Sequence, residues 1–333
     1  MFSRCFVCGR AREDAFGVFA GEVEGRELVA SPWTPPAWTA DETGRVRQEF
    51  VWAPGTDSEA TDPAADGRAQ SAYSGAMADA QAIDPGPARS LRRWNLGVGL
   101  IHAAQATILL LVADDASLPV YGSWINGPPG AAELVRGEPL FELSFAAATA
   151  AFLYLAAIDH LLVGGPLRGW YERNLGRSIN YARWIEYSLS ASLMVVLIAM
   201  LCGVLELTAL IALFGVNAGM ILFGLEMERT QSPGRDADWR PFWFGSILGA
   251  VPWVVITYQL IRADQQADVP GFVFGIFFSL LVLFALFPVN MVLQYRRVGP
   301  WRDYLYGEKA YIVLSLTAKS ALAWQVYAGA LAG

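Results

Sequence analysis

The stretch AYIVLSLTAKSALAWQVYAGAL, residues 310–331, indicates the fold class of this protein. It is a mostly apolar run that is long enough to cross a bilayer as a helix, which takes about 20 residues. A single cation, Lys319, lies near its middle. A lysine at the centre of a membrane helix costs about 2.5–3.5 kcal/mol on insertion scales, so it marks a functional position with a partner elsewhere in the chain.

Two interpretations of Lys319 are open from this stretch alone. Burial disfavours the charged form of an amine, and a neutral amine condenses with an aldehyde, so Lys319 is a candidate to bind a carbonyl cofactor covalently. The other lysine of the chain is Lys309, and arginine side chains do not form this bond. The alternative is an ion pair that only stabilises a helix bundle.

The composition also places the chain in a membrane. Hydrophobic residues make up 54% of the sequence and charged residues 17%, which is too apolar for a soluble domain of this size. The net charge of -7 does not indicate a positively charged surface for binding nucleic acid. Of the three cysteines, Cys202 lies in an apolar run, and Cys5 and Cys8 form a single CxxC. One CxxC is a weak signal for zinc or redox chemistry, so we predict no metal site.

Residues 1–88 differ from the rest of the chain. They are rich in Gly, Pro, Ala and acidic residues, contain short β-like pieces at 27–30 and 48–52, and end in the linker-like residues 84–87. We expect no signal peptide, because the first apolar run is too short. The segment is predicted to be an N-terminal extension: a small accessory domain, a disordered tail, or untranslated sequence upstream of a start at Met77. The second domain is then 89–333.

From Leu91 onward, seven stretches each approach the length that a bilayer requires. They predict an all-α membrane protein, a bundle of seven transmembrane helices at about residues 92–113, 140–163, 180–203, 205–227, 241–261, 271–294 and 309–331. The first connection, 114–139, is the longest, and its NGPPG at 126–130 is a turn signal. It predicts a small hairpin-like loop between the first two helices.

Positive charges near the ends of these spans predict the orientation. Thirteen Arg and Lys side chains fall on the side of the N-terminus, and two, Arg136 and Arg262, fall on the other side. We therefore expect a multi-pass protein of the cell membrane, with the N-terminus cytoplasmic and the C-terminus extracellular.

Glu186, in the third predicted span, is the candidate partner of Lys319. At 1.5 Å per residue, Glu186 lies about 9 Å and Lys319 about 15 Å into their spans from the cytoplasmic side. A lysine side chain leans back toward the N-terminus of its helix by several Å, so the two charged groups are expected to meet. Each charge alone would be costly at this depth, whereas a pair is tolerated.

Further polar residues are predicted on the cytoplasmic side of this pair and indicate a hydrated cavity. They are the two histidines of the chain, His102 and His160, with Gln105, Asp159, Asn180 and Ser315. A lone membrane histidine more commonly makes an interhelical hydrogen bond, but two at similar depth favour the cavity. By contrast, residues 189–200 of the third span contain no ionisable side chain, so this helix offers no outward path for a proton.

Long motifs in the predicted spans are specific enough to indicate a family. They are RWIEYSLSASLMVVLIAM (183–200), FGVNAGMILFG (214–224), PFWFGSILGAVPW (241–253), VPGFVFG (269–275) and GEKAYIVLSLTAKSALAWQVYAG (307–329), with NGPPG in the first loop. In these motifs the chain resembles the heliorhodopsins, a family of retinal proteins, over about residues 91–333. The resemblance implies a rhodopsin-like bundle with inverted topology, in agreement with the charge count, and it does not extend to the first 76 residues.

The resemblance also implies roles for individual residues. It implies all-trans retinal bound to Lys319 as a Schiff base, with Glu186 as its counterion and Ser315 beside the linkage. Positions implied near the chromophore are Tyr187, Met220, Trp243, Phe284 and Trp324. A cytoplasmic polar cavity is implied for His102, His160, Gln105, Asn95, Asn180, Arg183 and Glu308. Ala156 departs from family members that carry a serine there, so the hydrogen bonding around Glu186 is expected to differ.

The function implied by the resemblance is light sensing, by a photoreceptor that is not an enzyme. A slow photocycle would signal without appreciable ion pumping. The alternatives are a light-driven proton transporter or light-gated conductance, and a light-regulated modulator of an enzyme. Expected partners are the lipid bilayer, a second copy of the chain in a homodimer and an unidentified signalling partner, but no nucleic acid.

Overall fold

The computed structural model describes residues 83–114, 116–128, 130, 133–230 and 237–331, and five short strands before them. The chain divides into two units, Met1–Asp79 and Ala80–Gly333. The strands of the first unit are β1 (Arg12–Glu13), β2 (Phe19–Val23), β3 (Arg26–Val29), β4 (Ala37–Ala40) and β5 (Val46–Glu49). They pair antiparallel in the orders β1-β2-β3 and β4-β5. The predicted start at Met77 and the Cys5–Cys8 pair lie outside the described residues.

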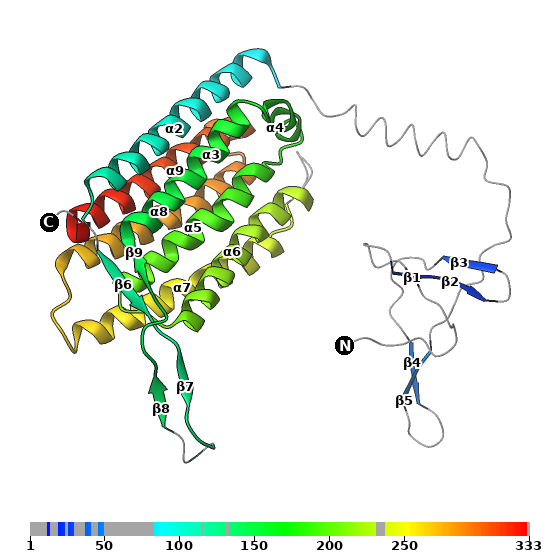
Figure 1. Cartoon of the computed structure of the whole chain (residues 1–333). Coiled ribbons are helices and arrows are strands. Elements are labelled where there is room, and N and C mark those ends of the chain that lie inside the picture. The colour runs from blue at the N-terminus through cyan, green and yellow to red at the C-terminus, as the bar shows by residue number, and fades with distance from the viewer. Residues whose placement is uncertain are drawn as a thin grey trace. The chain divides into compact units, whose positions relative to one another are not determined.

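The second unit is a bundle of long helices that run side by side (Figure 1). Within the described ranges these are α2 (Pro85–Val112), α3 (Phe145–Gly164), α5 (Tyr181–Leu201), α6 (Leu207–Thr230), α7 (Arg240–Asp264), α8 (Gly271–Tyr295) and α9 (Tyr304–Val326). A short helix, α4 (Arg168–Leu175), connects α3 to α5, and a 3-10 turn, η1 (Gly299–Arg302), precedes α9. A π-helical turn, η2 (Tyr327–Leu331), follows α9. The prediction of an all-α, seven-helix bundle is confirmed.

The helices α2, α3, α5, α6, α7 and α8 are long and apolar enough to cross a membrane, judged over the part of the chain that the structure describes. Helix α9 has a similar length, 23 residues, but it contains Glu308, Lys309 and Lys319 and is less apolar. Glu308, Ser315 and Lys319 are buried inside the bundle. These three polar side chains of α9 therefore face protein and not lipid.

Three helix starts differ from the sequence prediction by five residues or more. Helix α9 begins at Tyr304, where residue 309 was predicted. Helix α2 begins at Pro85, inside residues 84–87 that were predicted as a linker. Proline suits the first helical position, because the N–H that it lacks has no intrahelical partner there. The second span was predicted to begin at residue 140, but residues 141–144 form strand β9. Helix α3 begins only after Ser144, which caps it by accepting the N–H of Ala147.

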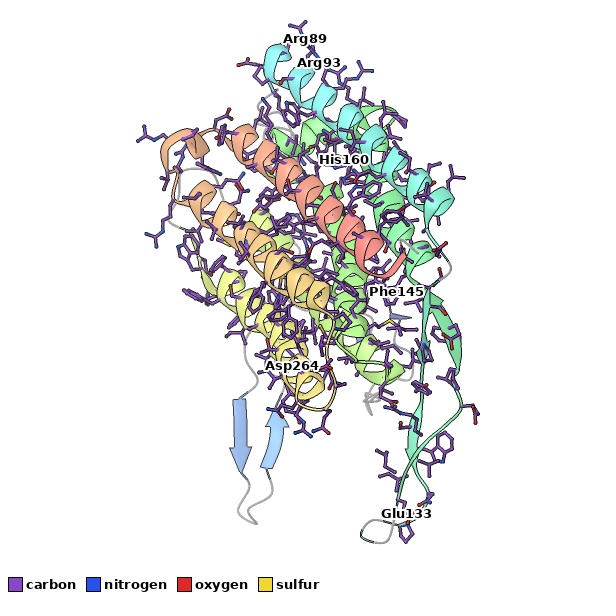
Figure 2. All side chains as sticks on the ribbon, turned by 90° about the vertical axis from the view of Figure 1, so that its left-hand side faces the viewer. Arg89, Arg93, Glu133, Phe145, His160 and Asp264 are labelled. Carbon is purple, nitrogen blue, oxygen red and sulfur yellow. The ribbon has the colours of Figure 1, made fainter. Side chains whose placement is uncertain are left out.

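The predicted hairpin between the first two long helices is confirmed. Strand β6 (Ser117–Val120) pairs with β9 (Phe141–Ser144), and β7 (Ser123–Ile125) pairs with β8 (Leu134–Arg136), both antiparallel. The hairpin extends beyond the bundle, with Glu133 near its tip (Figure 2). Its base is tied to the α5–α6 connection, since the N–H of Leu207 donates to the carbonyl of Tyr121 at 2.8 Å and Arg136 pairs with Glu206 at 3.2 Å.

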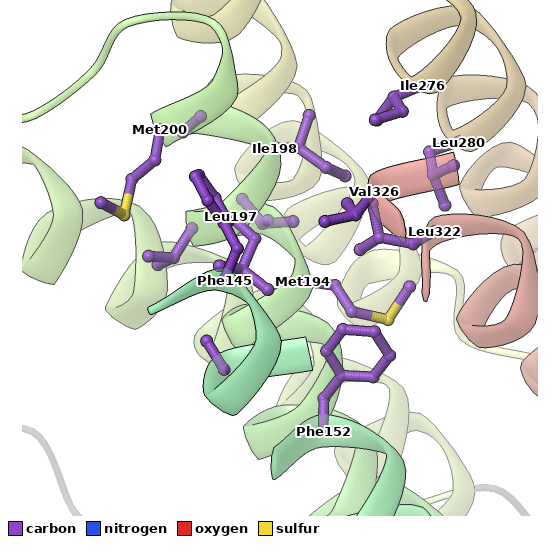
Figure 3. Packing of buried hydrophobic residues seen from close by; sticks show 14 of the residues in the cluster. Phe145, Phe152, Met194, Leu197, Ile198, Met200, Ile276, Leu280, Leu322 and Val326 are labelled. Carbon is purple, nitrogen blue, oxygen red and sulfur yellow. The ribbon is translucent and has the colours of Figure 1, made fainter. Parts of the chain in front are cut away.

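The end of the bundle nearest the hairpin has an apolar core. Its centre is the second half of α5, where Met194, Leu197 and Ile198 are at most 1% exposed. Side chains from α3, α8 and α9 pack around them, among them Phe152, Ile276, Leu280, Leu322 and Val326 (Figure 3). Residues 193–201 are apolar on every face, which is the pattern of a helix segment enclosed on all sides. The buried polar side chains described next lie toward the other half of α5.

Candidate functional site

Lys319 of α9 and Glu186 of α5 form a buried ion pair. The Nζ of Lys319 lies 3.3 Å from Oε1 and 3.4 Å from Oε2 of Glu186. The two residues are 3% and 7% exposed. Ser315, one turn before Lys319, accepts a hydrogen bond from Nζ at 2.8 Å. The structure therefore brings together the lysine, its predicted partner and the predicted neighbouring serine, and the pair is neutral as a whole, which is what makes two charges tolerable here.

An aromatic ring lies beside this pair. The Nζ of Lys319 is 4.8 Å from the centre of the Tyr187 ring, within reach of a cation–π interaction. The hydroxyl of Tyr187 donates to the carbonyl of Tyr311 at 3.0 Å, which ties the ring to α9. Glu186 and Tyr187 reach α9 together because Arg183, Glu186 and Tyr187 follow the i, i+3, i+4 spacing of one helix face.

Tyr187 also lines an apolar cavity of about 270 Å³, whose wall is formed by residues of α5, α6, α7, α8 and α9. Its wall is mainly aromatic and includes Trp184, Tyr187, Met220, Phe242, Trp253, Phe284, Phe287 and Tyr311. The volume is close to the lower end of small-molecule sites, roughly 300 Å³. Two glycines of α7 help to open it: a Cβ at Gly249 would lie 3.1 Å from Cγ of Met220, and one at Gly245 would lie 3.2 Å from the carbonyl oxygen of the same methionine.

The structure separates the residues predicted near the chromophore into two groups. Tyr187, Met220 and Phe284 line the apolar cavity. Trp243 is 61% exposed and lies outside it, whereas its neighbour Phe242 lines it. Trp324 also lies outside, and its indole N–H donates to Oε1 of Gln105 at 2.9 Å. We therefore assign neither tryptophan to the cavity wall.

A small polar cavity of about 20 Å³ adjoins Glu186, which is room for about one water molecule. Five of the residues predicted for a polar cavity line it, namely Asn95, His160, Asn180, Arg183 and Glu308. Asp159 and Tyr171 line it as well. Nδ1 of His160 lies 2.7 Å from Oδ1 of Asn95, so the histidine is held by α2. A polar pocket thus adjoins the carboxylate of the buried pair.

The remaining two predicted cavity residues lie elsewhere. The ring of His102 stacks on that of His160, with centroids 6.0 Å apart, and its two nitrogens have no hydrogen-bond partner among the described residues. Gln105 is a correction: its partner Trp324 is five residues beyond Lys319, about 7.5 Å further along α9. Gln105 therefore lies on the hairpin side of the ion pair, where a count of thirteen residues from position 92, about 20 Å, also places it.

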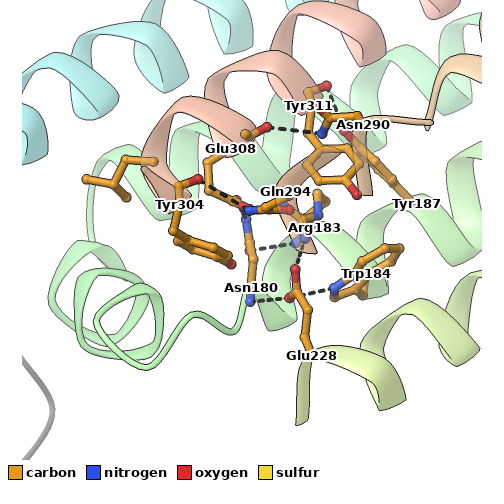
Figure 4. Close-up of polar contacts among 12 residues, drawn as sticks. Asn180, Arg183, Trp184, Tyr187, Glu228, Asn290, Gln294, Tyr304, Glu308 and Tyr311 are labelled. Carbon is orange, nitrogen blue, oxygen red and sulfur yellow. Dashed lines mark hydrogen bonds and ion pairs between the residues drawn. The ribbon is translucent and has the colours of Figure 1, made fainter. Parts of the chain in front are cut away.

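Arg183 is the centre of a second buried ionic cluster (Figure 4). Its guanidinium forms ion pairs with Glu228 of α6 and Glu308 of α9. The same group lies between two rings, 4.6 Å from the centre of Trp184 and 4.0 Å from that of Tyr311. Both rings also line the apolar cavity, so the cluster and the cavity share a wall.

Hydrogen bonds complete this cluster. The side-chain amide of Asn180 donates to Glu308 at 2.6 Å, and the backbone N–H of Asn180 donates to Glu228 at 2.9 Å. The indole N–H of Trp184 donates to Glu228 at 2.7 Å. Glu228 was not among the residues predicted for the site. The sequence did contain a signal for it, because Glu226 and Glu228 are two residues apart, so they lie on different faces of a helix and one of them can face the bundle interior. The structure leaves Glu226 half exposed, beside Arg229, and buries Glu228.

Comparison with known proteins identifies the family. The sequence model of the heliorhodopsin family matches residues 91–331, well over half of the chain. The chain belongs to the heliorhodopsin family. It is therefore a retinal protein of the rhodopsin type, embedded in a membrane. The residues of this heliorhodopsin fit such a chromophore, because a buried amine lies against Tyr187, which lines an apolar, mainly aromatic cavity.

Two solved structures are similar to this heliorhodopsin at low identity. A light-driven proton pump from Leptosphaeria maculans is 15% identical, with 74% of this chain and 97% of that chain covered and a TM-score of 0.48. A thermophilic rhodopsin from Rubrobacter xylanophilus is 18% identical, with 72% of this chain and 100% of that chain covered and a TM-score of 0.39. No curated protein matches the chain.

Proposed function

We propose that this heliorhodopsin is a light-sensing photoreceptor that carries all-trans retinal on Lys319 as a protonated Schiff base. Its slow photocycle signals without appreciable ion pumping, and we assign it no enzymatic activity. The observation that carries the proposal is the Lys319–Glu186 pair at 3.3 Å, in contact with Tyr187, which lines an apolar cavity. Retinal bound there supplies visible absorption and a light-driven isomerisation, which no side chain provides.

The residues around Lys319 have separate tasks in this proposal. Glu186 balances a positive charge at Nζ, and Ser315 orients Nζ through its hydrogen bond of 2.8 Å. The Tyr187 ring, 4.8 Å away, adds a favourable aromatic face for the same charge. The apolar wall beyond Tyr187 keeps water from the site, which strengthens each of these interactions.

Polar groups that could receive a proton from Nζ lie on one side of the ion pair, which favours sensing over pumping. Glu186 borders the small polar cavity, where His160 and Asp159 can accept a proton and Asn95 is held by a hydrogen bond to His160. On the hairpin side, α5 continues into the apolar core around Met194, Leu197 and Ile198. A proton that leaves Nζ is therefore expected to enter the polar cavity and return from the same side, with no net transfer across the membrane.

Illuminated cells that contain the pigment are expected to show no lasting pH change in the surrounding medium. The reason is the apolar second half of α5, which offers a proton no partner. The measurement records external pH in the light and dark, with and without a protonophore, and uses cells with the Lys319→Ala variant as the blank. A light-induced change that the protonophore abolishes would favour the proton transporter, and a light-gated current would favour the conductance.

The orientation and partners belong to the same proposal. Arg89 and Arg93 lie at the end of the bundle opposite the hairpin tip, and positive charge favours the cytoplasmic side (Figure 2). We infer a cell-membrane protein with that end inside and the C-terminus outside. Protease treatment of intact cells that carry a C-terminal tag tests this orientation, because only an external tag is cleaved.

We also propose that the protein forms a homodimer and acts on a signalling partner. The mass of the detergent-solubilised pigment tests the homodimer.

A chain that starts at Met77 is expected to form the same pigment as the full sequence. The long helices and all the site residues described above lie after residue 83. The measurement compares the absorption spectrum and thermal stability of the two chains after purification with retinal. Should the shorter chain fail to fold while the full chain succeeds, residues 1–76 are needed for the fold.

A further inference from the structure

Trp184 belongs both to the cavity wall and to the ionic cluster. Its side chain lines the apolar cavity, and its indole N–H donates to Oε2 of Glu228 at 2.7 Å. The residue is 7% exposed. One side chain thus joins the wall of the proposed retinal site to a carboxylate of α6 through a single hydrogen bond, and the roles assigned above to Lys319 and Glu186 do not use it.

Packing fixes the Trp184 ring against α6. A Cβ added at Gly224 would overlap two atoms of the ring, so the indole lies directly on the α6 backbone. Gly224 is one helical turn before Glu228. The ring therefore contacts α6 at two successive turns, by packing at Gly224 and by a hydrogen bond at Glu228. A displacement of the ring has to change at least one of these contacts.

The charge balance makes the hydrogen bond to Glu228 important. One guanidinium, that of Arg183, serves the two carboxylates Glu228 and Glu308, which are 2% and 1% exposed. The other groups that contact these carboxylates, Asn180 and Trp184, also donate hydrogen bonds. Both carboxyl groups are thus placed as hydrogen-bond acceptors, and they share a single guanidinium. A buried carboxylate in that position depends on each donor that it retains.

We propose that Trp184 is the positioning residue that transmits a change in the retinal cavity to the end of α6 through Glu228. The proposal rests on the proposed function, because light has to change the occupant of the cavity. Glu228 lies in the last turn of α6, which ends at Thr230. When the ring moves with the cavity wall, Glu228 loses a donor and this turn is held less firmly. The last turn of α6 is then the part of the bundle whose change in stability a signalling partner detects in the light.

Hydrogen exchange on the full-length pigment in lipid tests this proposal. Peptides that cover residues 225–230 are compared in the dark and under continuous light, and the parent is expected to exchange faster in the light by about tenfold. Trp184→Phe keeps an aromatic ring in the wall but has no N–H to donate. It is expected to stay coloured, to exchange faster in the dark, and to lose the difference between light and dark.

Trp301→Phe is the matched control. The indole N–H of Trp301 donates to Oδ1 of Asn290 at the same distance, 2.7 Å, but Trp301 does not line the cavity. This variant is expected to keep the light response of residues 225–230. Glu228→Gln is the second test variant, in case Trp184→Phe takes up no retinal. Glu228 does not line the cavity, so the pigment should form. Glutamine offers the indole N–H only a neutral acceptor, whose hydrogen bond is about half as strong, so the light response should be smaller.

Two results would overturn the proposal. One is a coloured parent whose residues 225–230 exchange equally in light and dark. The other is an unchanged light response in a coloured Trp184→Phe or Glu228→Gln variant, since a purely structural role would alter the dark exchange and leave the response to light. A parent chain that takes up no retinal contradicts the proposed function itself, and this proposal falls with it.

Discussion

Lys319→Ala is expected to give a folded protein that stays colourless when all-trans retinal is supplied. Lys319 is 3% exposed, and its amine lies against Tyr187, which lines the apolar cavity. The other lysine, Lys309, lies ten residues earlier in the chain. Arginine forms no such bond to an aldehyde, so the loss of visible absorption should be complete. The measurement is the absorption spectrum of the purified variant after incubation with retinal.

Two further variants make this experiment decisive. Lys309→Ala is the matched control and should keep the colour of the parent. Lys319→Ala also leaves Glu186 buried without its cation, and breaking a buried pair in this way typically costs about 3–5 kcal/mol. The double variant Lys319→Ala/Glu186→Gln removes both charges, so it should fold and still be colourless. A normal spectrum in either Lys319 variant would rule out attachment at this lysine.

Glu186→Gln is expected to move the absorption of the pigment to longer wavelength and to remove its response to acid. Glu186 lies 3.3 Å from Nζ and stabilises positive charge there in the ground state. Excitation spreads that charge away from the nitrogen, so a nearby anion raises the excitation energy. The attraction is of the order of a few kcal/mol at an effective dielectric constant near 20. In the parent, acid that protonates Glu186 should produce the same shift.

The titration of the solubilised pigment by absorption checks this expectation. The glutamine variant should also contain more pigment that has lost the proton from the nitrogen, because nothing balances the charge. Glu226→Gln is the matched control, since Glu226 is 49% exposed and pairs with Arg229. If Glu186→Gln titrates like the parent, Glu186 is not the counterion. Asp159, which lines the polar cavity beside it, is then the next candidate, and Asp159→Asn tests it.

The elements that followed from the sequence are those with a strong physical constraint. A bilayer requires about 20 apolar residues for each helix, so the long helices were predicted, although the starts of α2, α3 and α9 differ from the prediction by five to seven residues. A lysine at membrane depth requires an opposite charge, and Glu186 was placed opposite it by counting residues along two helices. The same count, thirteen residues from position 92 or about 20 Å, places Gln105 deeper than Lys319, which agrees with its hydrogen bond to Trp324.

The side of each helix that faces inward was much harder to predict. In a soluble protein the polar face marks the outside, but lipid is as apolar as the interior of a bundle, so the helical pattern loses this signal. Residues 242–244 of α7 are three consecutive aromatics, and the structure turns Phe242 into the cavity and leaves Trp243 61% exposed.

The sequence by itself determined the membrane class, the bundle of helices, the hairpin and the pairing of Lys319 with Glu186. Only the tertiary structure decided the wall of the apolar cavity and the second ionic cluster, in which Arg183 joins Glu228 and Glu308. The physical reason is the range of the interactions. Span length and the need to pair a buried charge are set by the bilayer, whereas a cavity wall depends on the rotation of five helices packed together.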